Sequence, residues 1–165
     1  MKTNLLSYYL SEAVKGNAEA SYKAGKMMAS EGTFNEVAIQ RRYIEAANAG
    51  LKEAQKELGA LGLCGKLITD DSTSFDIHYD TDYNNAIMWL KKAAQNGDTE
   101  CEIVVSAIEK CGVSVINTAR RSIELYHEAL CLSSFETFPC LMLFEVAMQY
   151  INHFGINKNS DRRIA

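Results

Sequence analysis

Two side chains in this sequence have the types and the spacing that nucleophilic catalysis uses. Cys131 and His127 are four residues apart, so on a helix the thiol and the imidazole would lie on one face. A cysteine nucleophile also needs a group that orients its base, and donors for an oxyanion. The sequence indicates neither, and it contains no phosphate loop, dinucleotide fingerprint or serine elbow. We therefore expect no catalytic residue, and a hydrolase using this pair is kept as an alternative function.

Acidic side chains gather in residues 64–81 and just beyond, which raises the question of a metal site. These positions, with one histidine among them, are Asp70, Asp71, Asp76, His78, Asp80 and Asp82. A calcium loop beginning at Asp80 would need Gly at its sixth position and Glu at its twelfth. The sequence has Asn85 and Lys91 there. We expect a solvated acidic loop, with no metal ion and no cofactor.

The cysteines show no metal-binding pattern either. Their spacings are irregular, without a CxxC motif or a zinc-type arrangement of Cys and His. We expect reduced thiols, mostly buried as small apolar residues. The five cysteines are Cys64, Cys101, Cys111, Cys131 and Cys140.

The composition is typical of one compact helical domain. Of the 165 residues 47% are hydrophobic and one is proline, which suits a chain with a buried core. The formal net charge is −4, whereas nucleic-acid-binding proteins usually carry a concentrated basic face. The N-terminal stretch has no continuous apolar run, so neither a signal peptide nor a membrane span is expected. We predict a cytoplasmic protein that binds neither nucleic acid nor membrane.

A pattern anchored on glycine occurs three times and determines the predicted architecture. A small-residue pair and two further residues precede each anchor, and a small residue follows four positions later. The anchors are Gly16, Gly50 and Gly97, which are 34 and 47 residues apart. Repeats of this length are typical of stacked pairs of helices. Each anchor is expected to end the first helix of a pair in a left-handed conformation, which Gly adopts without steric cost.

The second helix of each pair carries small residues at fixed places. Four positions after the anchors lie Ala20, Ala54 and Cys101, and nine positions after lie Gly25, Gly59 and, in the third segment, Ser106. Gly inside a helix costs roughly 0.5–1 kcal/mol relative to Ala, so its recurrence indicates a packing demand. We expect two helix backbones to approach closely there, with a looser contact at Ser106.

The apolar periodicity predicts eight helices. They cover residues 3–15, 18–30, 36–48, 52–62, 82–95, 99–111, 115–131 and 138–154. Trp89 lies on the apolar stripe of the fifth, so we expect it in the core and not stacked on a ligand. Asp98 is expected to cap the sixth. The prediction is an all-α, right-handed alpha-alpha superhelix (a solenoid) of about four helix pairs.

We interpret the chain, residues 1–165, as a single repeat domain. Its parts are repeats at about 5–32, 35–63 and 82–111, an insert loop at 64–81, and a degenerate helix pair at 115–155.

Residues 82–101 resemble the Sel-one-like repeat family of alpha-alpha hairpins. The matching positions are Asp82, Tyr83, Ala86, Trp89, Ala93, Ala94, Gly97 and Cys101. The second unit matches at Ala46, Ala47, Gly50, Ala54, Leu58 and Gly59, and the first at Ala13, Gly16, Ala20, Ala24 and Gly25. The long insert and the decay of the pattern after residue 112 depart from the family. The resemblance implies a tetratricopeptide-like adaptor, scaffold or bacterial immunity protein whose repeat-defining residues are not catalytic.

These features predict a module that binds another protein through its concave face and its insert loop. Candidate partner-binding residues are Tyr8, Tyr9, Arg42, Glu45, Lys91 and Tyr126 on the first helices, and Phe75, Asp76, His78, Tyr79 and Asp80 in the insert. An acidic loop with aromatic side chains suits a basic, pocketed partner such as a toxin or effector. The opposite possibility is that the loop packs back on its own helices.

Within this class we favour a bacterial inhibitory or immunity-type protein, or a regulatory adaptor. A self-associating structural protein is the second alternative, because the helix expected at 138–154 is apolar on nearly all sides. The chain is therefore expected to be a monomer or a weak homodimer through that helix.

Overall fold

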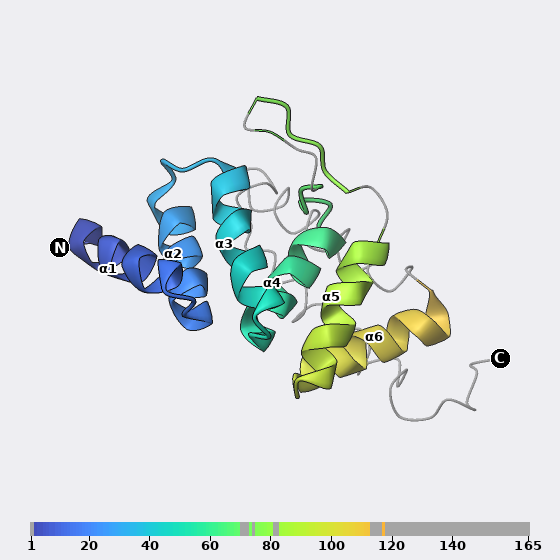
Figure 1. Ribbon diagram of the computed structural model, residues 1–165. Coiled ribbons are helices and arrows are strands. Elements are labelled where there is room, and N and C mark those ends of the chain that lie inside the picture. The colour runs from blue at the N-terminus through green and yellow to red at the C-terminus, as the bar shows by residue number, and fades with distance from the viewer. Residues whose placement is uncertain (1, 70–72, 74, 81–82, 113–116, 118–165) are drawn as a thin grey trace, which may run out of the picture.

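The computed structural model describes residues 2–69, 73, 75–80, 83–112 and 117, and the regular structure in this part is helical (Figure 1). The helices are α1 (Lys2–Val14), α2 (Ala18–Glu31), α3 (Glu36–Asn48), α4 (Lys52–Leu63), α5 (Asn84–Gln95) and α6 (Thr99–Cys111). Their bounds agree with the first six predicted helices to within two residues. Over the described residues no strand forms, so the all-α prediction is confirmed there. The helices expected at 115–131 and 138–154 lie outside these residues.

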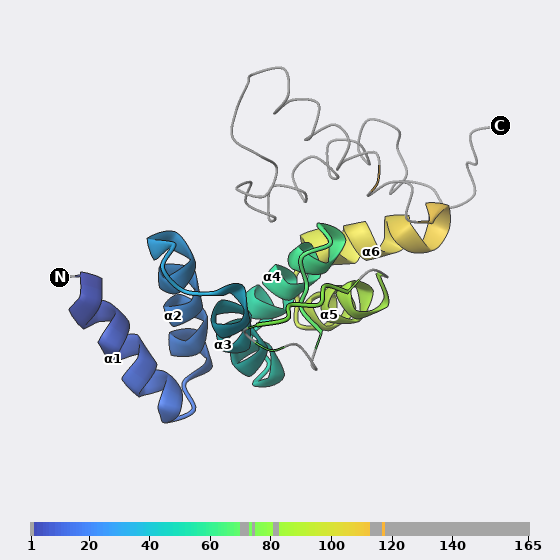
Figure 2. The same cartoon turned by 90° about the horizontal axis from the view of Figure 1, so that it is seen from above.

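Each helix packs on its neighbours in the chain, and the contacts of α2 with α3 and of α4 with α5, which join successive pairs, are the most extensive. Seen from above, α2, α4 and α6 lie toward one side of the molecule, and α1, α3 and α5 lie toward the other (Figure 2). The first helices of the three pairs therefore share one side.

The turn inside each pair is built in the same way. The anchors Gly16, Gly50 and Gly97 have φ angles of 92°, 96° and 100°, as a left-handed helix end requires. The amide of the residue after each anchor donates to the carbonyl five residues earlier, at 3.2, 3.1 and 3.0 Å. This closes the first helix and turns the chain back. Asp98 then caps α6 by accepting from the amide of Cys101 at 2.9 Å, which confirms its predicted role.

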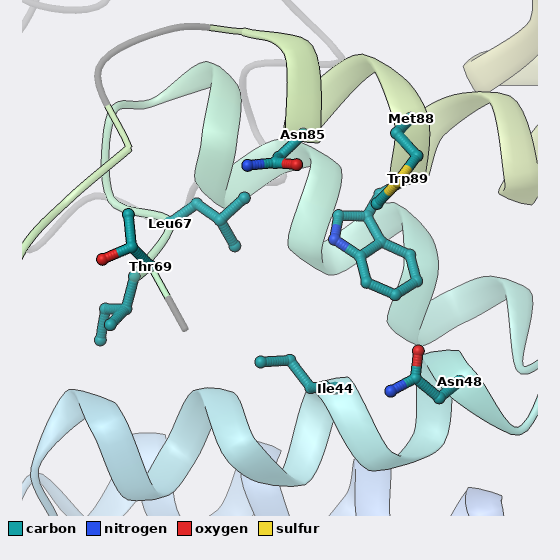
Figure 3. A pocket seen from close by; sticks show the side chains of 8 residues that line it. Ile44, Asn48, Leu67, Thr69, Asn85, Met88 and Trp89 are labelled. Carbon is teal, nitrogen blue, oxygen red and sulfur yellow. The ribbon is translucent and has the colours of Figure 1, made fainter. Parts of the chain in front are cut away.

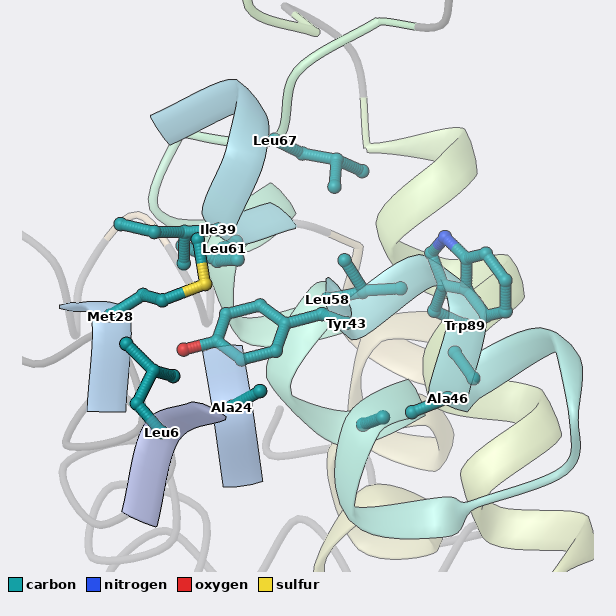
Figure 4. Close-up of a cluster of buried hydrophobic side chains, with 12 residues drawn as sticks. Leu6, Ala24, Met28, Ile39, Tyr43, Ala46, Leu58, Leu61, Leu67 and Trp89 are labelled. Atoms are coloured by element: carbon teal, nitrogen blue, oxygen red, sulfur yellow. The ribbon is translucent and has the colours of Figure 1, made fainter. Parts of the chain in front are cut away.

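The core runs along the contacts between successive helices (Figure 4). It contains one side chain of α1, Leu6, and continues through α2, α3 and α4 to Trp89 on α5. The small residues four positions after the anchors are all buried: Ala20 is 2% exposed, and Ala54 and Cys101 are 0% exposed. The prediction that these positions pack closely is confirmed.

The repeated helix glycines receive a large side chain from the next helix pair. A Cβ atom on Gly25 would lie 2.6 Å from the ring of Tyr43, and one on Gly59 would collide with the side chain of Leu90. Tyr43 and Leu90 each lie seven residues before the anchor of their own pair. The expected close approach of two backbones is therefore wrong at Gly25, where side-chain atoms fill the space, and it holds at Gly59, where a Cβ would also lie 3.4 Å from the backbone oxygen of Ala86. Backbones do approach at Gly62, where a Cβ would lie 3.1 Å from the Cα of Ala86.

We expect Gly59→Ala to destabilise the fold although Ala favours helices. The added methyl group meets Leu90, whose side chain is fully buried, so it can move only by displacing the residues packed around it. Overpacking of this kind costs about 1–3 kcal/mol. Urea denaturation followed by circular dichroism should show a lower free energy of unfolding. In combination with Leu90→Ala the loss should be smaller than the sum of the two single losses. Additive losses would contradict the proposed contact.

Candidate functional site

The insert is attached to the helices by a buried glutamine. Gln40 on α3 is 1% exposed. Its amide nitrogen donates to the carbonyl of Lys66 at 2.8 Å, and its carbonyl oxygen accepts from the amide of Ile68 at 3.0 Å. Leu67 between them is 4% exposed and belongs to the core. One side chain thus satisfies two backbone groups and fixes the start of the insert.

The two ends of the insert pair with each other like the strands of a hairpin. An antiparallel bridge joins Ile68 and Tyr79. The amide of Thr69 donates to the carbonyl of His78 at 3.0 Å, and the amide of Asp80 donates to the carbonyl of Leu67 at 2.7 Å. The chain therefore leaves α4 and returns toward α5 at the same place, and residues 75–78 project beyond the helices (Figure 1).

Gln40→Leu should release the insert from α3. The change leaves the carbonyl of Lys66 and the amide of Ile68 without their partner, and a buried unsatisfied group costs about 1–3 kcal/mol. We expect a lower free energy of unfolding and faster cleavage within residues 66–80 by a nonspecific protease, with the fragments identified by mass spectrometry. Gln95→Leu, at an exposed position of α5, is the control. Equal cleavage of the two variants would rule out this anchoring role.

The projecting part of the insert exposes an aromatic side chain. Phe75 is 98% exposed, and Tyr79 is 45% exposed. The imidazole Nε2 of His78 lies 3.0 Å from the carboxylate of Asp76.

Asp80 differs from the expected solvated acid, because it is 9% exposed and accepts from the side-chain amide of Asn85 at 2.6 Å. The base of the insert thus packs back on the helices, as one of the two sequence-based possibilities expects, while Phe75 points into solvent and binding of a partner by the insert stays a prediction.

A cavity of about 360 Å³ lies between α3, α5 and the base of the insert (Figure 3). Its lining is mixed, with four apolar side chains, two carboxamides, a hydroxyl and an indole, and none of the lining side chains is charged. The lining residues are Ile44, Asn48, Leu67, Ile68, Thr69, Asn85, Met88 and Trp89. Because α3 and α5 are the first helices of two pairs, the cavity lies between helices of the side predicted to bind a partner.

Trp89 has two roles in this arrangement. It is 9% exposed and belongs to the core cluster, as the sequence predicted. One edge of its indole, with the ring nitrogen, also faces the cavity (Figure 3). Within the described part of the chain no acceptor takes the indole N–H. The ammonium group of Lys92 lies 4.7 Å from the ring centroid and makes a cation–π contact.

The residues predicted on the first helices do not form one cluster. On α1, Tyr8 is 57% exposed, and Tyr9 is partly buried against the core. On α3, Arg42 pairs with Glu45 at 3.1 Å.

Two of these residues also bind the second helices. Glu45 accepts from the hydroxyl of Ser21 on α2 at 3.3 Å, and Lys91 pairs with Glu109 on α6 at 3.0 Å. Tyr126 lies outside the described residues, as do Cys131 and His127.

Sequence reasoning missed the side chains that line the cavity. Ile44 and Asn48 are four residues apart on α3, and Asn85 and Met88 are three apart on α5. Such spacings place them on one face of each helix, which was the available signal. The face of α3 that lies opposite α5 is set by how the chain packs across the insert. No local sequence pattern predicts that packing.

The described thiols are not suited to nucleophilic chemistry. Cys64 and Cys101 are buried and free of disulfides. Burial raises the pKa of the Cys101 thiol, and the carboxylate of Asp98 raises it further, so the reactive thiolate is disfavoured. Over the described residues, no group of three or more His, Cys, Asp or Glu side chains is placed to hold a metal ion.

Cys101 should resist alkylation in the folded protein. At about pH 8.5, the usual pKa of a thiol, iodoacetamide should modify it at least about 100-fold more slowly than in urea, as measured by peptide mass spectrometry. The unfolded thiol loses its proton above this pH while the folded one keeps it, so the free energy of unfolding should fall as pH rises. Cys101→Ala should weaken that dependence. Rapid alkylation of the folded protein would contradict the burial.

Comparison with known proteins assigns no family to this chain: no protein-family model, curated protein or solved structure matches it. Among the helices that the structure describes, none is both long and apolar enough to cross a membrane.

Proposed function

We propose that this protein is a protein–protein interaction module. Its binding surface would combine the side formed by α1, α3 and α5 with the projecting insert. The observation that carries the proposal is Phe75, a large aromatic side chain that is 98% exposed at the end of a segment whose base is fixed by Gln40. Exposed aromatic side chains held on a structured base are typical of binding hot spots.

We further propose that the helices form a right-handed superhelix of the Sel-one-like type, with a further helix pair after α6. The support is that Tyr43 on Gly25 and Leu90 on Gly59 are the same contact at two successive junctions. When one contact recurs between pairs, the same rotation relates each pair to the next.

Within this class we favour a bacterial inhibitory or immunity-type protein, or a regulatory adaptor, in the cytoplasm. The small size and the net charge of −4 support a soluble binder that complements a basic partner. Cys64 and Cys101 are not joined in disulfides, which is consistent with a reducing compartment.

Affinity capture with the full chain, from an extract of the source organism, should retain a protein partner. Phe75→Ser should weaken that binding by at least about tenfold, because truncation of a hot-spot residue typically costs this much or more. The matched control is Phe34→Ser, which removes a phenyl ring that is 37% exposed in the connection between α2 and α3. Binding strengths are to be compared by biolayer interferometry with the captured partner.

Equal losses in the two variants would show that Phe75 has no special part in binding. A wild-type chain that retains no protein from the extract would count against the proposed function as a whole.

A further inference from the structure

We propose that the cavity between α3 and α5 binds one apolar side chain of an extended partner peptide, together with the peptide carbonyl beside it. The inference rests on the proposed protein-binding function and specifies the chemistry of one site within it. It is based on the polar group at the cavity wall, the uncharged lining and the volume.

The first argument is the indole N–H of Trp89. The side chain is 9% exposed, and its ring nitrogen faces the cavity (Figure 3). Buried tryptophan N–H groups usually donate to a partner, and burial without one is unfavourable. Within the described part of the chain none of the acceptors fills this role. A carbonyl oxygen of a bound ligand would satisfy the donor.

The second argument is the chemical character of the remaining lining. Asn85 donates its side-chain amide to Asp80, which orients the group and leaves the oxygen on the side of Trp89 (Figure 3). Asn48 on the opposite wall makes no protein hydrogen bond among the described residues. Carboxamides offer a donor and an acceptor together, and so does a peptide group. An anionic or cationic ligand would meet no opposite charge in the lining, so an uncharged amide fits best.

The third argument is size. The volume of about 360 Å³ is at the lower end of the range for ligand sites, which is about 300–1,000 Å³. Ile44, Leu67 and Met88 provide an apolar wall for one aliphatic side chain. Met88 is 38% exposed, and Asn48 and Asn85 are exposed, so the mouth of the cavity is open to an extended chain that continues on both sides.

The chain offers a direct reporter of this site. Trp89 is the only tryptophan, so a ¹⁵N-labelled sample of the full chain gives one indole N–H signal in its NMR spectrum. Titration with N-acetyl-leucine methylamide should move this signal downfield with a Kd of the order of 1 mM, as expected for a ligand of this size. N-acetyl-glycine methylamide should bind at least about tenfold more weakly, because it lacks the apolar side chain. No shift at about 20 mM leucine derivative, well above that Kd, overturns the proposal.

A second probe tests whether the cavity recognises a peptide group or only an apolar chain. 3-Methylbutan-1-ol carries the same branched chain without a peptide group, and the proposal expects it to bind more weakly. If it binds as tightly as the leucine derivative, the site is a small-molecule site and the peptide assignment is wrong.

Two variants test the lining itself. Asn48→Ala should weaken binding of the leucine derivative about fivefold, as expected for the loss of one hydrogen bond. Asn4→Ala, the same change at an exposed position of α1, is the matched control and should leave binding unchanged. Far-UV circular dichroism checks that both variants are folded. Equal binding by both variants removes Asn48 from the site and contradicts the assigned pairing with a peptide group.

A random 12-residue peptide library, displayed on phage and selected on the full chain, distinguishes this proposal from the broader one. Selected peptides should contain one large aliphatic residue, and the leucine derivative should compete with them at the Trp89 signal. Peptides that bind without moving this signal, and that lose affinity in Phe75→Ser, would overturn the cavity proposal and leave the protein-binding function intact.

Discussion

The fit of a large side chain onto a helix glycine is the contact on which the rest of this structure depends. Tyr43 lies on Gly25, and Leu90 lies on Gly59. Each contact joins the second helix of one pair to the first helix of the next, so it sets the distance and the rotation between pairs. The Gly-anchored turns close each pair, and Asn96 beside the third anchor also donates to the carbonyl of Gly50 in the pair before it, at 3.3 Å. Polar contacts such as Tyr22 to Glu57 and Asn96 to Gln55 then join the same pairs at their surface.

The insert is compatible with this constraint because it leaves and returns at one point. The spacing between Gly50 and Gly97 is 47 residues instead of 34, yet Leu90 meets Gly59 just as Tyr43 meets Gly25. The pairing of Leu67 with Asp80 closes the extra chain into a projection, and Gln40 fixes its start. Gly62 then lets the helix that follows the insert approach α4 closely. The extra residues thus add surface without disturbing the contact between helix pairs.

The parts predictable from sequence are those encoded locally. The glycine anchors, the cap at Asp98 and the bounds of six helices follow from short-range patterns, because turns and caps involve neighbouring residues. The anchoring role of Gln40 was not predictable, since no pattern distinguishes a buried glutamine from an exposed one. The burial of Asp80 was missed for the same reason: its partner, Asn85, comes from the start of the next helix. The cavity arises only when α3 and α5 are placed side by side.

Trp89 shows why core and binding roles are not exclusive in such a fold. Most of its indole is used for packing, which makes its position rigid. The edge that faces the cavity carries the indole N–H, for which the described part of the chain supplies no acceptor. A buried donor without a partner costs about 1–3 kcal/mol, and a ligand that accepts from it recovers that energy on binding. The cavity beside the insert, between two helix pairs, is therefore the place where this fold offers a donor to a ligand.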